Sequence, residues 1–200
     1  MPRPPNKEQR RSQIIDGLAR VMADHGYAKA TIQAIAKAAG LTPGLVHYHF
    51  QNKQGILIAL IERLASVVRA RLDTDAADPI DKIDAAIDAL VGTKGGIESE
   101  AVACWVVIGA EAVRQPAVQS LYEALIREVI EQFASGFRSA MQAQGHSDST
   151  APAAALAVVA AMEGFFRLAA GSPSCVPSGS AAYSIKQIAR GFLESAEGAP

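Results

Sequence analysis

Apolar residues recur every three or four positions along most of this chain, and polar residues fill the intervals between them. This spacing places the apolar side chains on one face of an α-helix, and the strict alternation typical of a half-buried β-strand is lacking. The pattern therefore predicts an all-α protein with about nine helices. The predicted helices cover residues 7–25, 32–39, 43–50, 53–72, 79–91, 98–114, 117–144, 153–170 and 180–194.

Residues 31–57 carry the clearest local signals. Thr31 stands directly before an apolar helical stripe, where an N-cap side chain accepts a backbone hydrogen bond, and Gly40 follows the stripe at a position suited to left-handed backbone. Thr42 then caps a second, short helix that begins at Pro43, where proline loses no intrahelical hydrogen bond. The segment is therefore predicted to form a helix, a tight turn and a second helix.

The second helix has a buried face and an outward face. Val46 and Phe50 are four residues apart and share the buried face. The outward face suits a DNA groove, because it offers hydroxyl and backbone N–H groups to phosphates, a glycine for close approach, and stiff aromatic side chains to base edges. A surface aromatic cluster on an ordinary helical bundle is the alternative interpretation. The predicted DNA-contacting residues are Thr31, Thr42, Pro43, Gly44, His47, Tyr48, His49 and Lys53.

The aromatic run at residues 46–50, with Lys53 and Leu57 after it, resembles the recognition helix of TetR-family transcriptional regulators. The segments 34–36 and 39–41 upstream agree with the same pattern, and the match covers roughly the first quarter of the chain. The resemblance implies an N-terminal three-helix DNA-binding domain that contains a helix-turn-helix motif.

The same resemblance implies a division into two functional parts. Residues 1–53 are expected to bind DNA, and residues 54–200 to form a larger helical domain for effector binding and dimerisation. The implied partners are a palindromic double-stranded DNA operator, a small-molecule effector and a second copy of the chain. Paired recognition helices roughly 34–36 Å apart read two half-sites, which favours a homodimer.

Charge is unevenly distributed along the chain. Residues 1–53 carry eight Lys or Arg and three acidic residues, a net charge of +5, whereas the remainder carries −6. A basic head on an acidic body is typical of a protein that meets a polyanion at one end only, although chance segregation gives the same pattern.

The predicted body contains more apolar helix than a DNA-binding module needs, and it carries aromatic and acidic side chains within that helix. Such a mixture suits a small-molecule pocket, although most aromatic residues of this kind are simply core. The predicted pocket residues are Trp105, Glu111, Tyr122, Phe133, Glu163 and Phe166.

Two stretches of the body, residues 105–116 (WVVIGAEAVRQP) and 162–167 (MEGFFR), resemble the BetI-type branch of the TetR family. That resemblance implies an effector such as choline or a related metabolite. Aromatic faces and a carboxylate are suitable groups for a quaternary ammonium ion. A larger apolar effector, such as a drug, a fatty acyl compound or an aromatic metabolite, fits the residues as well.

The last two predicted helices carry small and apolar residues near one face. Small side chains let helix axes approach closely, so two helices from each of two subunits are expected to form a four-helix bundle. Packing inside one subunit is the alternative. The predicted interface residues are Ala157, Ala161, Gly164, Leu168 and Ile188.

The remaining features argue against other classes of protein. Cys104 and Cys175 lie far apart without a CxxC spacing, so neither a disulfide framework nor a metal site is expected. The N-terminus lacks an apolar signal core, and the apolar run around residues 153–162 is shorter than the ~20 residues of a membrane span, so a cytoplasmic protein without membrane contact is expected. No phosphate loop or nucleophile motif is present in the sequence, so the protein is expected to be neither an enzyme nor dependent on a cofactor.

These observations lead to one main hypothesis. The chain is expected to be a ligand-responsive transcriptional regulator, most simply a repressor that binds its operator as a homodimer and is released by an effector. An activator and an architectural DNA-binding protein without an effector pocket are the alternatives.

Overall fold

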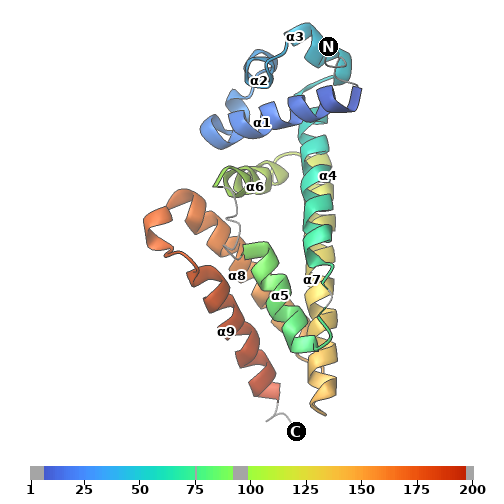
Figure 1. The fold of residues 1–200 in the computed structure, drawn as a ribbon, viewed down its shortest axis with the longest axis vertical. Coiled ribbons are helices and arrows are strands. Elements are labelled where there is room, and N and C mark those ends of the chain that lie inside the picture. The colour runs from blue at the N-terminus through green and yellow to red at the C-terminus, as the bar shows by residue number, and fades with distance from the viewer. Residues whose placement is uncertain (1–6, 75, 92–98, 197–200) are drawn as a thin grey trace, which may run out of the picture. The chain divides into compact units, whose positions relative to one another are not determined.

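The computed structural model describes residues 7–74, 76–91 and 99–196 (Figure 1). These residues form nine α-helices and one short 3-10 helix without a β-strand, which confirms the predicted all-α class. The sequence also predicts a proline- and arginine-containing arm at residues 1–5 and a glycine-rich break at residues 92–96, and both lie outside the described residues. The helices are α1 (Lys7–Lys29), α2 (Ile32–Ala39), α3 (Pro43–His49), α4 (Lys53–Leu72), α5 (Pro79–Val91), α6 (Ser99–Ala112), α7 (Pro116–Ala143), α8 (Ala151–Gly171), η1 (Pro173–Cys175) and α9 (Ser180–Ser195).

The boundaries of the helix-turn-helix segment follow the local sequence signals. The Thr31 hydroxyl oxygen accepts a hydrogen bond from the Ala34 N–H at 3.1 Å and so caps α2. Gly40 ends that helix with a left-handed φ of 67°. Thr42 caps α3 in the same way, with Pro43 as the first helical residue. These four predictions are confirmed.

The predicted end of the first helix at Gly26 holds only in part. Gly26 has a non-helical backbone with φ 76°, and a further helical turn follows it as far as Lys29. The glycine therefore kinks the helix, because it adopts the left-handed region that other residues avoid.

The chain packs as two compact units. One unit comprises residues 1–65 and 100–122, so α1–α3, the first part of α4, α6 and the start of α7 belong to it. The other comprises residues 66–99 and 123–200 and contains α5, α8 and α9. The division after residue 53 concerns function, and it stays a prediction.

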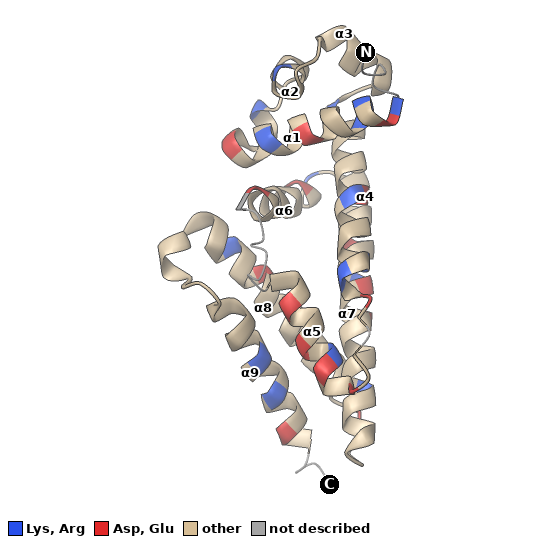
Figure 2. Ribbon diagram, in the orientation of Figure 1, with Lys and Arg blue, Asp and Glu red and all other residues tan. Residues whose placement is uncertain are grey.

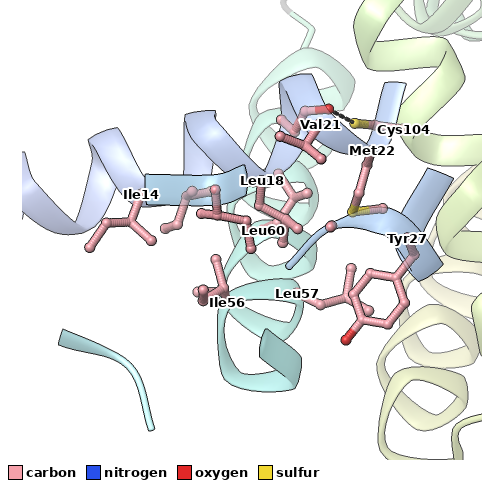
Figure 3. Packing of buried hydrophobic residues seen from close by; sticks show 14 of the residues in the cluster. Ile14, Leu18, Val21, Met22, Tyr27, Ile56, Leu57, Leu60 and Cys104 are labelled. Carbon is pink, nitrogen blue, oxygen red and sulfur yellow. Dashed lines mark hydrogen bonds between the residues drawn. The ribbon is translucent and has the colours of Figure 1, made fainter. Parts of the chain in front are cut away.

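The first unit is built around an apolar core between α1, α4 and α6 (Figure 3). Gly17 permits the close packing of α1 on α2, since a Cβ there would lie 2.8 Å from the Ile35 carbonyl oxygen. The buried Cys104 thiol of α6 donates a hydrogen bond to the Ala19 carbonyl oxygen of α1 at 3.1 Å. The residues labelled in the figure are Ile14, Leu18, Val21, Met22, Tyr27, Ile56, Leu57, Leu60 and Cys104.

The second unit joins α5 to α9 by charge as well as by apolar packing. Figure 2 shows acidic residues along α5 and basic residues on α9. The Lys186 ammonium lies 2.7 Å from Asp88 and 3.8 Å from Asp84, and Arg190 lies 2.9 Å from Asp84. Lys186 and Asp84 are each only 20 % exposed, so this cluster is screened less than an ordinary surface ion pair.

Helix α8 contains the most apolar window found among the described helices. Among the described residues, Ala151–Gly171 is the one helix whose length and composition would allow it to cross a membrane, and its most apolar window of 18 residues has a mean hydropathy of 1.6. The apolar run at residues 153–162 ends at Glu163, and the helix that contains it extends from two residues before the predicted start at 153 to one residue after the predicted end at 170. Core helices of water-soluble proteins meet the same criterion, and 28 % of the most apolar window of α8 is buried within the chain.

Candidate DNA interface

Helix α3 is anchored by two apolar side chains and exposes the residues between them. Val46 is fully buried and Phe50 is 6 % exposed, so both pack into the core of the first unit. His47 is exposed, and Tyr48 has an exposed fraction of 77 %. An aromatic side chain this exposed on a firmly anchored helix is available to a partner, which fits the predicted groove-reading face.

His49 differs from its two neighbours. Its ring meets the Tyr48 ring edge-on, with 5.1 Å between centroids, and its side chain is only half-exposed. The Nδ1 atom is buried without a hydrogen-bond partner. His49 therefore presents only part of its ring outward, and Tyr48 and His47 form the accessible centre of the face.

The N-terminal ends of α2 and α3 present hydroxyl and backbone donors. Thr31, Thr42, Pro43 and Gly44 are all exposed. Each threonine oxygen accepts a capping hydrogen bond, but its hydroxyl proton remains able to donate. The two hydroxyl groups therefore remain suitable donors to phosphate oxygens while they cap their helices.

Lys53 has a structural contact that the sequence analysis did not anticipate. Its ammonium donates to the Tyr27 carbonyl oxygen at 2.9 Å and lies 4.0 Å from the centroid of the Tyr27 ring. It thereby fastens the start of α4 to the turn after Gly26. Since an ammonium group has three donors, this contact leaves capacity for a phosphate.

Tyr27 is the buried partner in that contact. Burial raises the pKa of its hydroxyl, the negative charge of Glu111 raises it further, and a hydrogen bond with the Gln115 side chain opposes both effects. The phenol stays protonated at neutral pH and packs as a neutral group between the helix-turn-helix segment and the α6–α7 junction.

Two arginines of α1 reach the ends of the helix-turn-helix. The Arg11 guanidinium donates to the His49 carbonyl oxygen at 3.0 Å and lies 4.2 Å from the centroid of the Phe50 ring. Arg20 donates to the Ala38 carbonyl oxygen at 2.7 Å. No local signal in the sequence reveals either contact, because the partners are 38 and 18 residues away.

Three predicted pocket residues belong to the first unit. The rings of Trp105 and Tyr122 stack with 5.0 Å between centroids and an interplanar angle of 30°. The Glu111 carboxylate accepts a hydrogen bond from the Gln115 amide at 2.7 Å. The structure thus brings Trp105 and Tyr122 together and pairs Glu111 with the residue that precedes α7.

The other three predicted pocket residues belong to the second unit. Phe133 is 2 % exposed and lines a cavity of about 460 Å³, a volume within the usual range for small-molecule sites. Glu163 and Phe166 are half-buried residues of α8 and do not line this cavity. Phe133 is therefore the single member of the predicted set at the cavity.

The cavity has both apolar and polar lining residues. Ile83 and Phe133 contribute apolar surface, while a two-pronged ion pair joins the Arg69 guanidinium to the Glu128 carboxylate at 2.8–3.0 Å. The hydrogen bond and charge of Arg69 lower the pKa of Glu128, so the pair stays ionised at neutral pH. Sequence reasoning missed these residues because their charges look like ordinary solvated surface. The lining is Arg69, Leu72, Asp73, Thr74, Pro79, Lys82, Ile83, Ala86, Glu128, Gln132, Phe133, Ser135, Gly136 and Ser139.

The predicted dimer residues lie at partly or fully exposed positions of α8 and α9. Ala157 and Ala161 are half-buried and Gly164 is exposed, while Leu168 is 48 % and Ile188 is 37 % exposed. The same two helices expose two further large apolar side chains, Leu156 and Tyr183. Apolar surface of this extent on a pair of packed helices is typical of an interaction site.

Within the part of the chain that the structure describes, no group of three or more His, Cys, Asp or Glu side chains is arranged to hold a metal ion.

Comparison with known proteins agrees with the geometry of both regions. Residues 14–60 match the bacterial regulatory proteins of the tetR family, and residues 79–196 match the C-terminal region of BetI-type transcriptional repressors. The chain is 28 % identical over 148 residues to the HTH-type transcriptional regulator BetI of Escherichia coli O139:H28. The matched segment covers 72 % of this chain and 76 % of that protein.

Solved structures show the same fold at lower identity. A transcriptional regulator from Rhodococcus sp. Rha1 superposes with a TM-score of 0.81 at 20 % identity, over 95 % of this chain and 99 % of its own. A putative transcriptional regulator from Saccharomonospora viridis, solved in complex with choline, gives a TM-score of 0.77 at 21 % identity, over 94 % and 96 % of the two chains.

Proposed function

Since the chain belongs to the tetR family of bacterial regulatory proteins and carries a BetI-type C-terminal region, we propose that it is an effector-released repressor that binds a palindromic operator as a homodimer. The family consists of DNA-binding transcription factors, not enzymes. The observation that carries the proposal is the exposed face of α3, where Tyr48 and His47 project from a helix fixed by Val46 and Phe50.

On DNA, α3 enters the major groove. Tyr48 and His47 meet base edges, while the Thr31 and Thr42 hydroxyls and the backbone N–H groups at the start of α3 meet phosphates. Lys53 contributes one further charge from the start of α4. A single helix of seven residues contacts few bases, so useful specificity requires two copies of the chain on two half-sites.

The second copy covers the exposed face of α8 and α9. The low burial of α8 within one chain supports this arrangement, because a helix with a mean hydropathy of 1.6 needs an apolar partner. The residues that meet across the interface are those of the predicted set, with Leu156 and Tyr183 added.

The effector binds in the second unit, and its cavity is the first site to test. Effector binding favours a state in which the recognition helices no longer match two successive grooves. The size of this shift is set by the difference between the effector's affinities for the two states. The S. viridis regulator was solved with choline, and the relative from E. coli is a BetI protein, so choline and related quaternary ammonium compounds are the first class to screen.

The test begins with selection of a DNA site from genomic fragments by purified protein. Tyr48→Ala is then compared with Val113→Ala, which removes an apolar side chain of similar exposure in the same unit. Affinity for the selected site falls about 5- to 150-fold for Tyr48→Ala and stays unchanged for Val113→Ala, since one good base contact contributes about 1–3 kcal/mol. Equal affinities for both variants would exclude α3 as the reading helix.

A reporter gene behind the selected site tests the direction of regulation. Expression is low with the protein and rises when the effective compound is added. Expression that requires the protein would identify an activator, and a specific site that no compound of the panel releases would favour the architectural alternative.

A further inference from the structure

Two arginines of α1 each contact the carboxyl end of one helix of the helix-turn-helix. Arg20 donates to the carbonyl oxygen of Ala38, in the last turn of α2, and Arg11 donates to that of His49, the last residue of α3. The last four carbonyl groups of a helix have no partner within it and carry the negative end of its dipole. A cation at that position is therefore stabilising.

Helix α3 depends on such support more than α2 does. It has only seven residues, well below the ~12–15 that an isolated helix needs in water. The residue after each helix donates its N–H back to that helix, but Gly40 after α2 is left-handed, whereas Phe50 after α3 is extended with φ −140°. The carboxyl end of α3 consequently lacks a glycine cap, and Arg11 occupies that end.

Arg11 makes a second contact at the same place. Its guanidinium carbon lies 4.2 Å from the centroid of the Phe50 ring, and Phe50 is itself buried. A planar guanidinium can donate to a carbonyl and stack over an aromatic ring at the same time, which the compact ammonium of lysine does less well. Arg11 thus holds both the last carbonyl of α3 and the residue that anchors it.

We propose that Arg11 is a positioning residue for the recognition helix, which it fixes against α1 before DNA arrives, and that it does not itself bind a phosphate. The proposal rests on the proposed function, because positioning matters only if α3 reads DNA.

The experiment compares Arg11→Ala, Arg11→Lys and the control Arg10→Ala. Arg10 is the adjacent cation, and its side chain donates to Gln13 within α1, so its removal changes net charge equally without touching α3. Two quantities are measured for each protein. One is amide hydrogen exchange in α3 of the free protein, and the other is affinity for the selected DNA site as a function of salt concentration.

For Arg11→Ala, exchange in α3 becomes faster without DNA, and affinity falls about tenfold at every salt concentration, as expected when a charge-assisted contact to a helix end is lost. Arg11→Lys recovers part of both losses, and Arg10→Ala leaves α3 exchange unchanged. Exchange in α6, in the same unit, shows that the variant remains folded.

A different pair of results overturns the proposal. If α3 exchange stays unchanged and the slope of log affinity against log salt falls by about 0.9, Arg11 contacts a phosphate. Unchanged affinity would likewise exclude a positioning role. If the unaltered protein selects no DNA site, the proposed function fails, while the exchange measurement still reports whether Arg11 holds α3.

Discussion

The side-chain amide of Gln54 donates to the side-chain oxygen of Gln115 at 3.2 Å and joins the first turn of α4 to the residue that precedes α7. The Gln115 amide in turn donates to Glu111 at 2.7 Å, and the Gln115 side chain also hydrogen-bonds with that of Tyr27. One glutamine therefore connects α1, α4 and α6 within the first unit. It also explains why Glu111, predicted as an effector contact, has a partner inside the protein.

Replacing Gln115 tests the strength of this connection. Gln115→Ala is expected to lower the free energy of unfolding by about 1–3 kcal/mol, since two half-buried partners lose a hydrogen bond. Gln119→Ala, four residues later at an exposed position, is the matched control and is expected to change it by less than about 0.5 kcal/mol. Urea unfolding followed by circular dichroism measures both. Equal midpoints would show that water replaces the Gln115 contacts without loss.

Lys53 is expected to affect stability as well as DNA binding. Lys53→Ala removes the hydrogen bond to the Tyr27 carbonyl oxygen and the contact over its ring, so the midpoint of thermal unfolding falls. Lys53→Met keeps the aliphatic chain and isolates the effect of the charge. Affinity for the selected site falls in both variants, and lower affinity with unchanged thermal stability would assign Lys53 to phosphate contact alone.

Gly17 is expected to tolerate no side chain. A Cβ at this position would lie 2.8 Å from the Ile35 carbonyl oxygen and 3.1 Å from the Ala39 Cβ, and backbone atoms move less easily than a flexible side chain. Gly17→Ala therefore lowers the free energy of unfolding by about 1–3 kcal/mol through overpacking between α1 and α2.

Gly55→Ala is the control for Gly17→Ala in the same unit. Its Cβ would meet Asn52 and Phe50 at 3.7 and 3.9 Å, which are ordinary contact distances. Its unfolding midpoint is expected to stay the same or to rise, because alanine is the better helix former. Similar destabilisation of both variants would contradict the steric explanation.

Cys104 makes stability depend on alkaline pH. Burial raises the pKa of its thiol from 9.0 to about 11. Between these values the unfolded chain releases the thiol proton and the folded chain retains it, so the stabilisation is complete below pH 9 and is lost as pH rises towards 11. The raised pKa of Tyr27 acts in the same direction.

Two measurements check the role of Cys104. The decline in stability between pH 9 and 11 is smaller in Cys104→Ala than in the unaltered protein. Maleimide at pH 8 modifies the exposed Cys175 in the folded protein and leaves the buried Cys104 unmodified until urea is added. Rapid labelling of both thiols in the folded state would show that α6 opens readily.

Dimerisation is expected to depend on the exposed apolar face of α8 and α9. Leu168→Glu places a charge where the second copy of the chain packs, so the variant is expected to be monomeric in sedimentation experiments and to lose site-specific DNA binding. Val113→Glu introduces the same charge at a position 85 % exposed in the other unit, and it leaves the oligomeric state unchanged. A monomeric unaltered protein would exclude the proposed homodimer.

The sequence by itself determines the helical class and the helix-turn-helix segment. Thr31, Gly40, Thr42 and Pro43 act on backbone groups within a few residues of themselves, so their effects are visible in the order of residues alone. The division of α3 into a buried and an exposed face follows equally from a spacing of four residues.

The tertiary structure alone decides the contacts between distant segments. The partners of Lys53 and Arg11 lie 26 and 38 residues away, so no periodicity reveals that these cations fasten helix ends. The same holds for the predicted pocket, whose residues the structure divides between two units, and for the cavity at Arg69 and Glu128. Helix periodicity fixes which residues share a face. The segment that packs against that face is many residues away in the sequence, so periodicity does not identify it. Only the folded structure decides how far each charge is desolvated and how well each side chain fits its neighbours.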